Sequence, residues 1–257
     1  MTPNDGSAGD ADYGAIGLHY ARFRQPEPAI AAQILTALGD ARLVLNVGAG
    51  AGSYEPEDRT VVAVEPSATM RGQRPARLVP AIAATAEALP FEDKAFDAAM
   101  ATFTVHQWQD LGAGLREMRR VTRGPVVVLT CAPGDVQKFW LNDYAPGVLA
   151  AEARRYPQLD RLAEGLGGNV RIEPVPVPLE CRDGFNEAYY GRPEMLLDGA
   201  ARLSCSAWSF VPEHVAAGYV EDLRGALADG RWDAAYGHLR TQPHYLGSLF
   251  LVIAALE

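Results

Sequence analysis

Three glycines stand at alternate positions, Gly48, Gly50 and Gly52, directly after the apolar run LVLNV. Because glycine has no Cβ, a backbone built from it can turn sharply and approach a ligand closely. A carboxylate, Glu65, ends the next apolar run, 17 residues after Gly48. At the end of a strand, such a carboxylate can accept hydrogen bonds from both hydroxyls of a ribose. Together the glycines and Glu65 indicate a site for an adenosine-type ligand.

The spacing of the glycines bears on which adenosine-type ligand it is. The dinucleotide fingerprint is G-x-G-x-x-G, and its third glycine would fall on Ser53. The chain instead has G-x-G-x-G, which disfavours NAD without excluding it, because a small serine can be accommodated at that position.

Alternating strand and helix patterns must position these residues. Short apolar runs at 43–47, 61–64, 95–105 and 125–130 predict strands that are buried on both faces of a parallel sheet. Residues 26–38 and 110–121 repeat apolar side chains at helical spacing, and the first of these helices should end at Gly39. Strands that alternate with helices predict an α/β fold with a doubly wound sheet.

The alternation breaks after Thr130, and we expect an inserted helical cap there. We divide the chain into a flexible start (1–19), a core (20–131), substrate cap insertions (132–169 and 179–245) and remaining core strands (170–178 and 246–257). Prolines confine the strand at 170–178 to a sheet edge. The aromatic side chains of the cap either line an apolar acceptor pocket or form the core of the cap itself.

Composition excludes several classes of function. The net charge of −9 disfavours a nucleic-acid partner, because proteins that bind polyanions usually show a basic face. No apolar run is long enough to cross a membrane, and the acidic start is unlike a signal peptide, so we expect a cytoplasmic protein. The three cysteines are odd in number and lack a C-x-x-C pair, so we expect reduced thiols and no metal site.

An ordered set of motifs between Tyr20 and Thr130 carries a family resemblance. NVGAGAG, VVAVEPS, AEALPF, FDAAMATFTVHQW and LREMRRV follow one another in the order and spacing of that family. The chain resembles the class I S-adenosylmethionine-dependent methyltransferases of the small-molecule type. The resemblance implies a mostly parallel, seven-stranded Rossmann-like sheet and S-adenosylmethionine as the cofactor.

The resemblance also implies a role for individual residues. The glycine loop would lie against the methionine part of the cofactor, Glu65 would hold the ribose, residues 85–87 would flank the adenine, and Arg24 would meet the cofactor's carboxylate. The implied cofactor-binding residues are Tyr20, Arg24, Asn46, Gly48, Ala49, Gly50, Gly52, Glu65, Pro66, Thr85, Ala86, Glu87 and Thr102. Two positions depart from the family pattern, since Asn46 and Thr85 stand where an aspartate is usual.

The expected reaction is an in-line transfer of a methyl group to O, N or C of a small organic molecule, by a monomer or a homodimer. His106 is the candidate general base, and the competing interpretation is that it packs structurally beneath the acceptor pocket. Two alternatives remain open. One is a non-methylating cofactor-binding protein or cyclase on the same scaffold, and the other is an NAD-dependent oxidoreductase.

Overall fold

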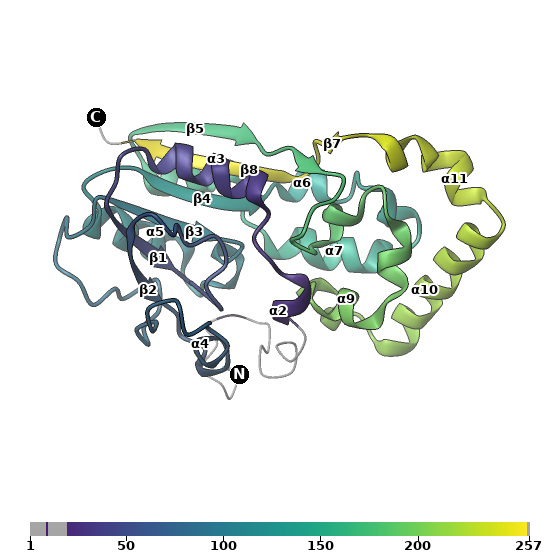
Figure 1. The fold of residues 1–257 in the computed structure, drawn as a ribbon, viewed down its shortest axis with the longest axis horizontal. Coiled ribbons are helices and arrows are strands. Elements are labelled where there is room, and N and C mark those ends of the chain that lie inside the picture. Colours follow the sequence, from purple (N-terminus) through teal and green to yellow (C-terminus); the bar gives the residue numbers. More distant parts are fainter. Residues whose placement is uncertain (1–8, 10–19, 256–257) are drawn as a thin grey trace.

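A six-stranded sheet with helices on both faces forms the centre of the computed structural model, which describes residue 9 and residues 20–255 (Figure 1). The strands lie in the order β2-β1-β3-β4-β8-β5. The first four are parallel, whereas β8 runs antiparallel to both β4 and β5. The strands are β1 (Leu43–Val47), β2 (Thr60–Val64), β3 (Ala98–Thr102), β4 (Val126–Cys131), β5 (Asn169–Pro174) and β8 (Leu249–Ala255). The predicted α/β fold and the predicted edge position of β5 are confirmed.

Helices cover both faces of the sheet because its strands send apolar side chains to both sides. The covering helices are α3 (Pro28–Leu38), α5 (Leu111–Val121) and α8 (Leu159–Leu166). Val44 and Met100 pack with α3 on one face, and Leu45 and Val128 pack with α5 and α8 on the other. The strands other than β5 can therefore be mostly apolar, as expected for strands that are buried on both faces, whereas the edge strand β5 is largely exposed.

The ends of the two predicted helices follow from their capping residues. Glu27 accepts a hydrogen bond from the backbone N–H of Ala29 at 3.2 Å and begins α3, which ends at Gly39 with a φ of +58°. Asp110 caps α5 by accepting from the N–H of Ala113 at 2.9 Å. Capping satisfies N–H groups that have no partner inside the helix. Both helices are confirmed.

The edge of the sheet beside β2 differs from the prediction. Residues 48–59, which join β1 to β2, form turns rather than a helix, and β2 is followed by the short helix α4 (Ala68–Gly72). Beyond α4 the chain meets β2 in a single parallel bridge between Val64 and Ile82. Pro75 and Pro80 lie in this stretch, and proline cannot donate to a strand ladder. The sheet in the described residues therefore has six strands rather than seven.

A helical part lies beside the sheet, to the right in Figure 1. Its elements are α6 (Pro133–Val136), η3 (Trp140–Asp143), α7 (Pro146–Arg155), β6 (Val177–Pro178), η4 (Asn186–Tyr189), η5 (Pro193–Leu197), α9 (Gly199–Leu203), η6 (Ser206–Phe210), α10 (Glu213–Ala228), α11 (Arg231–Tyr236), η7 (Gly237–Thr241) and β7 (His244–Tyr245). Among the described residues there are two further short helices, α2 (Tyr20–Phe23) and η2 (Val105–Gln107). In the described residues, every helix is too short or too polar to cross a membrane.

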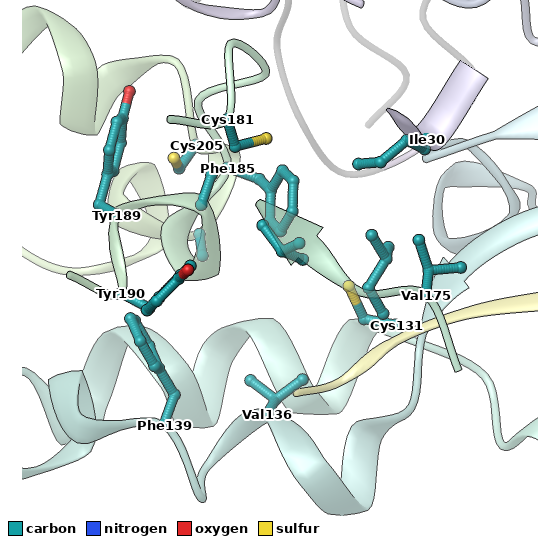
Figure 2. Close-up of a cluster of buried hydrophobic side chains, with 14 of the residues drawn as sticks. Ile30, Cys131, Val136, Phe139, Val175, Cys181, Phe185, Tyr189, Tyr190 and Cys205 are labelled. Atoms are coloured by element: carbon teal, nitrogen blue, oxygen red, sulfur yellow. The ribbon is translucent and has the colours of Figure 1, made fainter. Parts of the chain in front are cut away.

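Aromatic side chains form much of the core of the helical part. The rings of Trp140 and Trp232 meet edge to face with centroids 5.4 Å apart, and Tyr190 stacks on Tyr245 at 5.1 Å. Figure 2 shows Tyr190 above Phe139, in one cluster with side chains from the sheet. For these rings, the structure favours the expectation of a cap core over that of an acceptor pocket.

One helix of the predicted cap segment 132–169 packs on the sheet. Leu162 and Leu166 of α8 are buried in the same cluster as Leu115 of α5 and Val252 of β8. The division of the chain into core and cap stays a prediction, but α8 belongs with the helices that cover the sheet.

Candidate active site

A pocket of about 800 Å³ opens where β1, β2 and β3 end, at the edge predicted from the glycines. In an open α/β sheet, ligands bind beyond the carboxyl ends of the strands. We call it the first pocket. It brings together eight residues that the sequence predicts at the cofactor site: Arg24, Gly48, Ala49, Gly50, Glu65, Pro66, Ala86 and Thr102.

The glycine loop follows β1 in a conformation that favours glycine. Gly48 and Gly50 have φ values of +68° and +52°. A Cβ on Gly48 would lie 2.0 Å from Oγ1 of Thr104, and one on Gly50 would lie 3.3 Å from Cε of Met70. The loop therefore needs glycine for its own backbone and for close packing against the pocket wall, as well as for the approach of a ligand.

Glu65 follows β2, and its buried carboxylate is held by two backbone groups. Oε2 accepts from the N–H of Gly50 at 2.8 Å, and Oε1 accepts from the N–H of Ser67 at 2.8 Å. Hydrogen bonds to an ionised group are stronger than those between neutral groups, so these two fix the carboxylate against the glycine loop.

Several predicted residues lie outside the lining of the first pocket. They are Asn46, Gly52, Thr85, Glu87 and His106. Glu87 accepts from the backbone N–H groups of Gln109 and Asp110 at 2.8 and 3.2 Å, ahead of α5. Tyr20 is the first residue of α2, and its side chain lies outside the described residues. The cofactor-binding roles of Tyr20, Asn46, Gly52, Thr85 and Glu87 stay predictions, as does the catalytic role of His106.

Asn46 belongs to a buried polar network behind the glycine loop. Its Nδ2 donates to Oε1 of Glu55 at 3.0 Å, and Oε2 of Glu55 pairs with Nη2 of Arg74 at 2.9 Å. The side chains of Glu55 and Arg74 are only 2% and 3% exposed. An aspartate at position 46 would place a second carboxylate against Glu55, so the neutral amide fits the network better.

A second pocket, of about 450 Å³, adjoins the first. The two pockets share Arg24 and Phe103 in their linings. Most of the second pocket comes from the helical part and from the residues after β3. Its lining consists of Arg24, Phe103, His106, Glu152, Arg155, Tyr156, Phe185, Asn186, Ser204, Cys205, Ser206 and Ala207.

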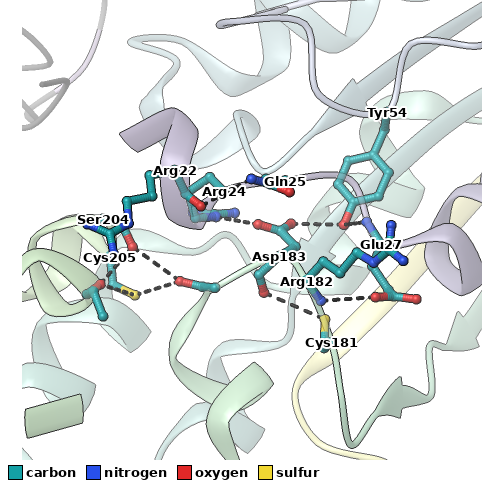
Figure 3. A network of polar contacts seen from close by, with 12 residues as sticks. Arg22, Arg24, Gln25, Glu27, Tyr54, Cys181, Arg182, Asp183, Ser204 and Cys205 are labelled. Carbon is teal, nitrogen blue, oxygen red and sulfur yellow. Dashed lines mark hydrogen bonds and ion pairs between the residues drawn. The ribbon is translucent and has the colours of Figure 1, made fainter. Parts of the chain in front are cut away.

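The wall between the pockets is a polar network that ties residues 24–27, at the start of the described chain, to the helical part (Figure 3). Arg24 Nε donates to Oδ1 of Asp183 at 2.5 Å, and the Tyr54 hydroxyl donates to Oδ2 at 2.8 Å. The Arg24 guanidinium lies 5.0 Å from the centre of the Phe103 ring, within the range of a cation–π contact. Burial and the neighbouring Asp183 raise the pKa of Tyr54 well above its ordinary value, so its hydroxyl stays protonated and donates.

Two residues of this wall adopt a left-handed backbone conformation, which is uncommon outside glycine. The φ angles of Tyr54 and Phe103 are +63° and +51°. Such conformations cost free energy and persist where the surrounding structure enforces them, often at functional sites. Phe103 lines both pockets, and Tyr54 holds Asp183, which lines the first pocket.

His106 lines the second pocket and not the first, whereas Arg24 lines both. Its ring lies 4.6 Å from that of Tyr156, and its Nδ1 is buried with no hydrogen-bond partner among the described residues. Burial, and then the charges of Arg155 and Arg24, lower the pKa of His106 well below its ordinary value. The imidazole is therefore neutral at pH 7, as a general base must be, and its catalytic role stays a prediction.

Sequence reasoning missed several residues that line the first pocket. They are Gly9, Ala51, Ser53, Met70, Phe103, Thr104, Gln107, Trp108 and Asp183. Local signals existed for most of them, because Met70 follows Glu65 closely and residues 103–108 follow β3. Asp183 had no such signal, since it reaches the wall from 159 residues beyond Arg24.

Comparisons with known proteins agree with this geometry. A family model described as "Methyltransferase domain" matches residues 45–128. A malonyl-[acyl-carrier protein] O-methyltransferase of Pseudescherichia vulneris is 32% identical over 183 residues, which cover 66% of this chain and 72% of that protein. A demethylmenaquinone methyltransferase of Mycolicibacterium gilvum is 41% identical over 70 residues, 27% of this chain and 31% of that protein. Four curated relatives, among them the Mycolicibacterium gilvum protein, match this chain over only 30 to 43% of their own length.

Among solved structures, similarity extends over nearly the whole chain. The crystal structure of a protein described as a methyltransferase from an antibiotic biosynthesis pathway of Anabaena variabilis has a TM-score of 0.85 and 27% identity. The comparison covers 92% of this chain and 100% of that one. These similarities agree with the mostly parallel sheet and with the glycine loop beside Glu65. The chain belongs to the class I S-adenosylmethionine-dependent methyltransferases.

Proposed function

We propose that this chain transfers a methyl group from S-adenosylmethionine in the first pocket to O, N or C of a small organic acceptor in the second pocket. The observation that carries the proposal is that the two pockets adjoin and share Arg24 and Phe103. Transfer by in-line displacement needs the donor and the acceptor side by side, and two adjoining pockets meet that need.

The residues of the first pocket fit S-adenosylmethionine. Glu65, with its carboxylate fixed by Gly50 and Ser67, would accept from the ribose hydroxyls. The loop that begins at Gly48 would face the methionine part, and Met70 and Trp108 supply apolar wall for the adenine ring. When bound, S-adenosylmethionine supplies a methyl group that is activated by the positive charge on its sulfur.

The contribution of the chain is mainly to position the acceptor and to exclude water. Phe103 and Arg24 would hold the acceptor against the first pocket. Where the acceptor is an alcohol or an ammonium group, it must also lose a proton, and the neutral imidazole of His106 would accept it.

The acceptors of the relatives do not transfer to this chain. The names of those relatives refer to a demethylmenaquinone and to a malonyl group on an acyl-carrier protein. The family model that matches here covers residues 45–128, which form the cofactor side of the site. Most of the second pocket comes from residues beyond that range, so a different acceptor is compatible with the similarity.

The test is to incubate the full-length protein with S-adenosylmethionine that carries an isotopically labelled methyl group. Small-molecule, protein and nucleic-acid fractions of a cell extract serve as acceptors, and the label is followed by mass spectrometry. We expect label in the small-molecule fraction alone. Label in a macromolecular fraction would contradict the proposal, and unlabelled fractions together with tight cofactor binding would favour the non-methylating alternative.

A further inference from the structure

The outer side of β5 is an exposed edge of the sheet. β5 is the last strand in the order of the sheet, and among the described residues it pairs only with β8. It lies along the upper margin of the ribbon in Figure 1. All of its residues except Val170 are exposed. An exposed edge presents backbone N–H and C=O groups with which a further strand can pair.

The register with β8 determines which backbone groups of β5 point outward. In an antiparallel ladder, directly opposite residues alternate between pairs that exchange hydrogen bonds and pairs that do not. Val175, just beyond β5, donates to the carbonyl of Leu249 at 2.9 Å, and the register of the ladder places these two residues opposite each other. Residues 171 and 173 therefore also direct their backbone groups toward β8.

The residues between them direct their backbone groups away from β8. These residues are Val170, Ile172 and Pro174. Pro174 has no N–H, and proline within a sheet is found where that missing group would face solvent. The outer side of β5 thus offers two N–H groups and three C=O groups to another strand.

The side chains of β5 carry one charge of each sign on the same face. Side chains of a strand alternate between its faces, so Arg171 and Glu173 lie on one face and Ile172 on the other. Nη1 of Arg171 lies 3.4 Å from Oε1 of Glu173, and the two side chains are 64% and 49% exposed. Charged side chains on an edge strand usually keep other strands away. They favour pairing only with a strand that sets the opposite charge against each of them.

A second copy of β5 is such a strand in one register. When two copies pair antiparallel about a two-fold axis at Ile172, Arg171 of each copy lies opposite Glu173 of the other. Moving the axis by one residue would set Arg171 against Arg171, or Glu173 against Glu173, and like charges directly opposite are destabilising.

The same register matches the outward backbone groups. Ile172 of each copy would donate to and accept from Ile172 of the other copy, and the N–H of Val170 would donate to the carbonyl of Pro174. The exposed Ile172 side chains would also meet across the axis and bury apolar surface. Charge, hydrogen bonding and burial therefore favour one and the same register.

We propose that two copies of this chain associate through β5, antiparallel and with the two-fold axis at Ile172, so that their sheets become continuous. The residues of this surface line neither pocket, so the inference goes beyond the proposed function and does not depend on it. An edge of six residues covers less surface than the roughly 1,200 Å² that stable interfaces bury. The dimer should therefore dissociate on dilution and leave dilute protein monomeric.

The test is sedimentation velocity on the full-length protein over about a hundredfold range of concentration, where mass action should raise the sedimentation coefficient from that of a monomer toward that of a dimer. Arg171→Glu sets carboxylates opposite each other, and Glu173→Arg sets guanidiniums opposite each other. Each variant alone should dimerise at least tenfold more weakly. An equimolar mixture of the two variants should dimerise again, because every carboxylate of one chain then faces a guanidinium of the other.

Two further variants serve as a probe of the backbone and as a control. Ile172→Pro removes an outward N–H without removing a bond to β8, and it should abolish the dimer. Arg224→Glu breaks an exposed ion pair with Glu221 on α10, away from β5, and should leave dimerisation unchanged. Circular dichroism shows whether each variant is folded.

Three results would overturn the proposal. One is a sedimentation coefficient of the unmodified protein that does not change with concentration, which is also the result expected if β5 pairs with a strand of a different protein. The second is a dimer that tolerates both charge reversals, because its interface would then lie elsewhere. The third is a mixture of the two variants that associates no better than either variant alone. The first result needs no variant, so a variant that fails to fold does not affect it.

Discussion

Arg24 and Asp183 form a buried ion pair at the wall between the two pockets, with side chains only 10% and 3% exposed. Arg24 directly follows α2, and Asp183 precedes η4 in the helical part. Glu27 adds a parallel link, because its Oε2 accepts from the N–H of Arg182 at 3.0 Å (Figure 3). Residues 24–27 are thereby tied to residues 182 and 183 at the wall between the pockets. A contact between Arg24 and the cofactor's carboxylate stays a prediction, and Asp183 would share the guanidinium with it.

The ion pair should contribute strongly to stability. Asp183→Asn removes a buried negative charge that pairs with Arg24 and should lower the free energy of unfolding by about 3 kcal/mol, the scale on which a broken buried pair acts. Denaturant unfolding measures the change. The control is Glu173→Gln, which breaks an exposed pair with Arg171 and should cost less than about 0.5 kcal/mol. Equal losses of unfolding free energy in the two variants would show that the buried pair contributes no more to stability than the exposed pair.

Glu65 should matter strongly for cofactor affinity. Glu65→Ala removes one or two charge-assisted hydrogen bonds to the ribose and should weaken S-adenosylhomocysteine binding by about 2 kcal/mol, roughly thirtyfold. The control is Glu173→Gln on β5, at the opposite edge of the sheet from β2, which should leave the affinity nearly unchanged. Calorimetry on both variants is the measurement. Unchanged affinity in Glu65→Ala would refute the ribose role.

Restoring the usual aspartate at position 46 should harm this protein. Asn46→Asp places a carboxyl group against Glu55 in a buried network, so we expect a loss of about 1 to 3 kcal/mol in the free energy of unfolding at pH 7. The new carboxyl should have a raised pKa in the folded protein, because burial and Glu55 both disfavour its ionised form. The loss should therefore grow as pH rises and shrink in acid. A stabilised variant would show that Glu55 and position 46 do not interact as described.

His106 gives a prediction on rate once an acceptor is known. If its neutral imidazole takes a proton, His106→Gln should lower kcat by about a hundredfold or more, with little change in cofactor affinity. The pKa of His106 is lowered, so the unmodified enzyme should keep its rate well below pH 6.5, where an ordinary histidine would be protonated. Intact turnover in the variant would refute the general-base role and favour a packing role.

Glu187 should make stability fall as pH rises. Burial raises its pKa from 4.5 to about 8, while its carboxylate oxygens accept from the N–H of Ser248 at 3.0 and 2.9 Å. The folded protein thus binds an extra proton between pH 4.5 and 8. Over that window the free energy of unfolding should fall by up to about 1.4 kcal/mol per pH unit on account of this group. Glu187→Gln keeps an acceptor for Ser248 and should flatten the fall; identical pH profiles for the two proteins would count against the raised pKa.

The parts of the site that sequence could predict are those that follow a strand directly. The glycine loop after β1 and Glu65 after β2 were predictable because buried strands and their turns have local patterns. The wall and the second pocket were not, since Arg24 meets Asp183 across 159 residues. The six strands also differ from the seven that the resemblance implied, because the chain beyond α4 meets β2 in a single bridge.

The most direct measurement is a calorimetric titration of the full-length protein with S-adenosylmethionine, S-adenosylhomocysteine and NAD. Family membership and the fit of the first pocket predict that both sulfur compounds bind and that NAD does not, with affinity reduced in Glu65→Ala. Tight binding of NAD, with no response to either sulfur compound, would contradict the assignment of the first pocket and the methyl transfer that depends on it.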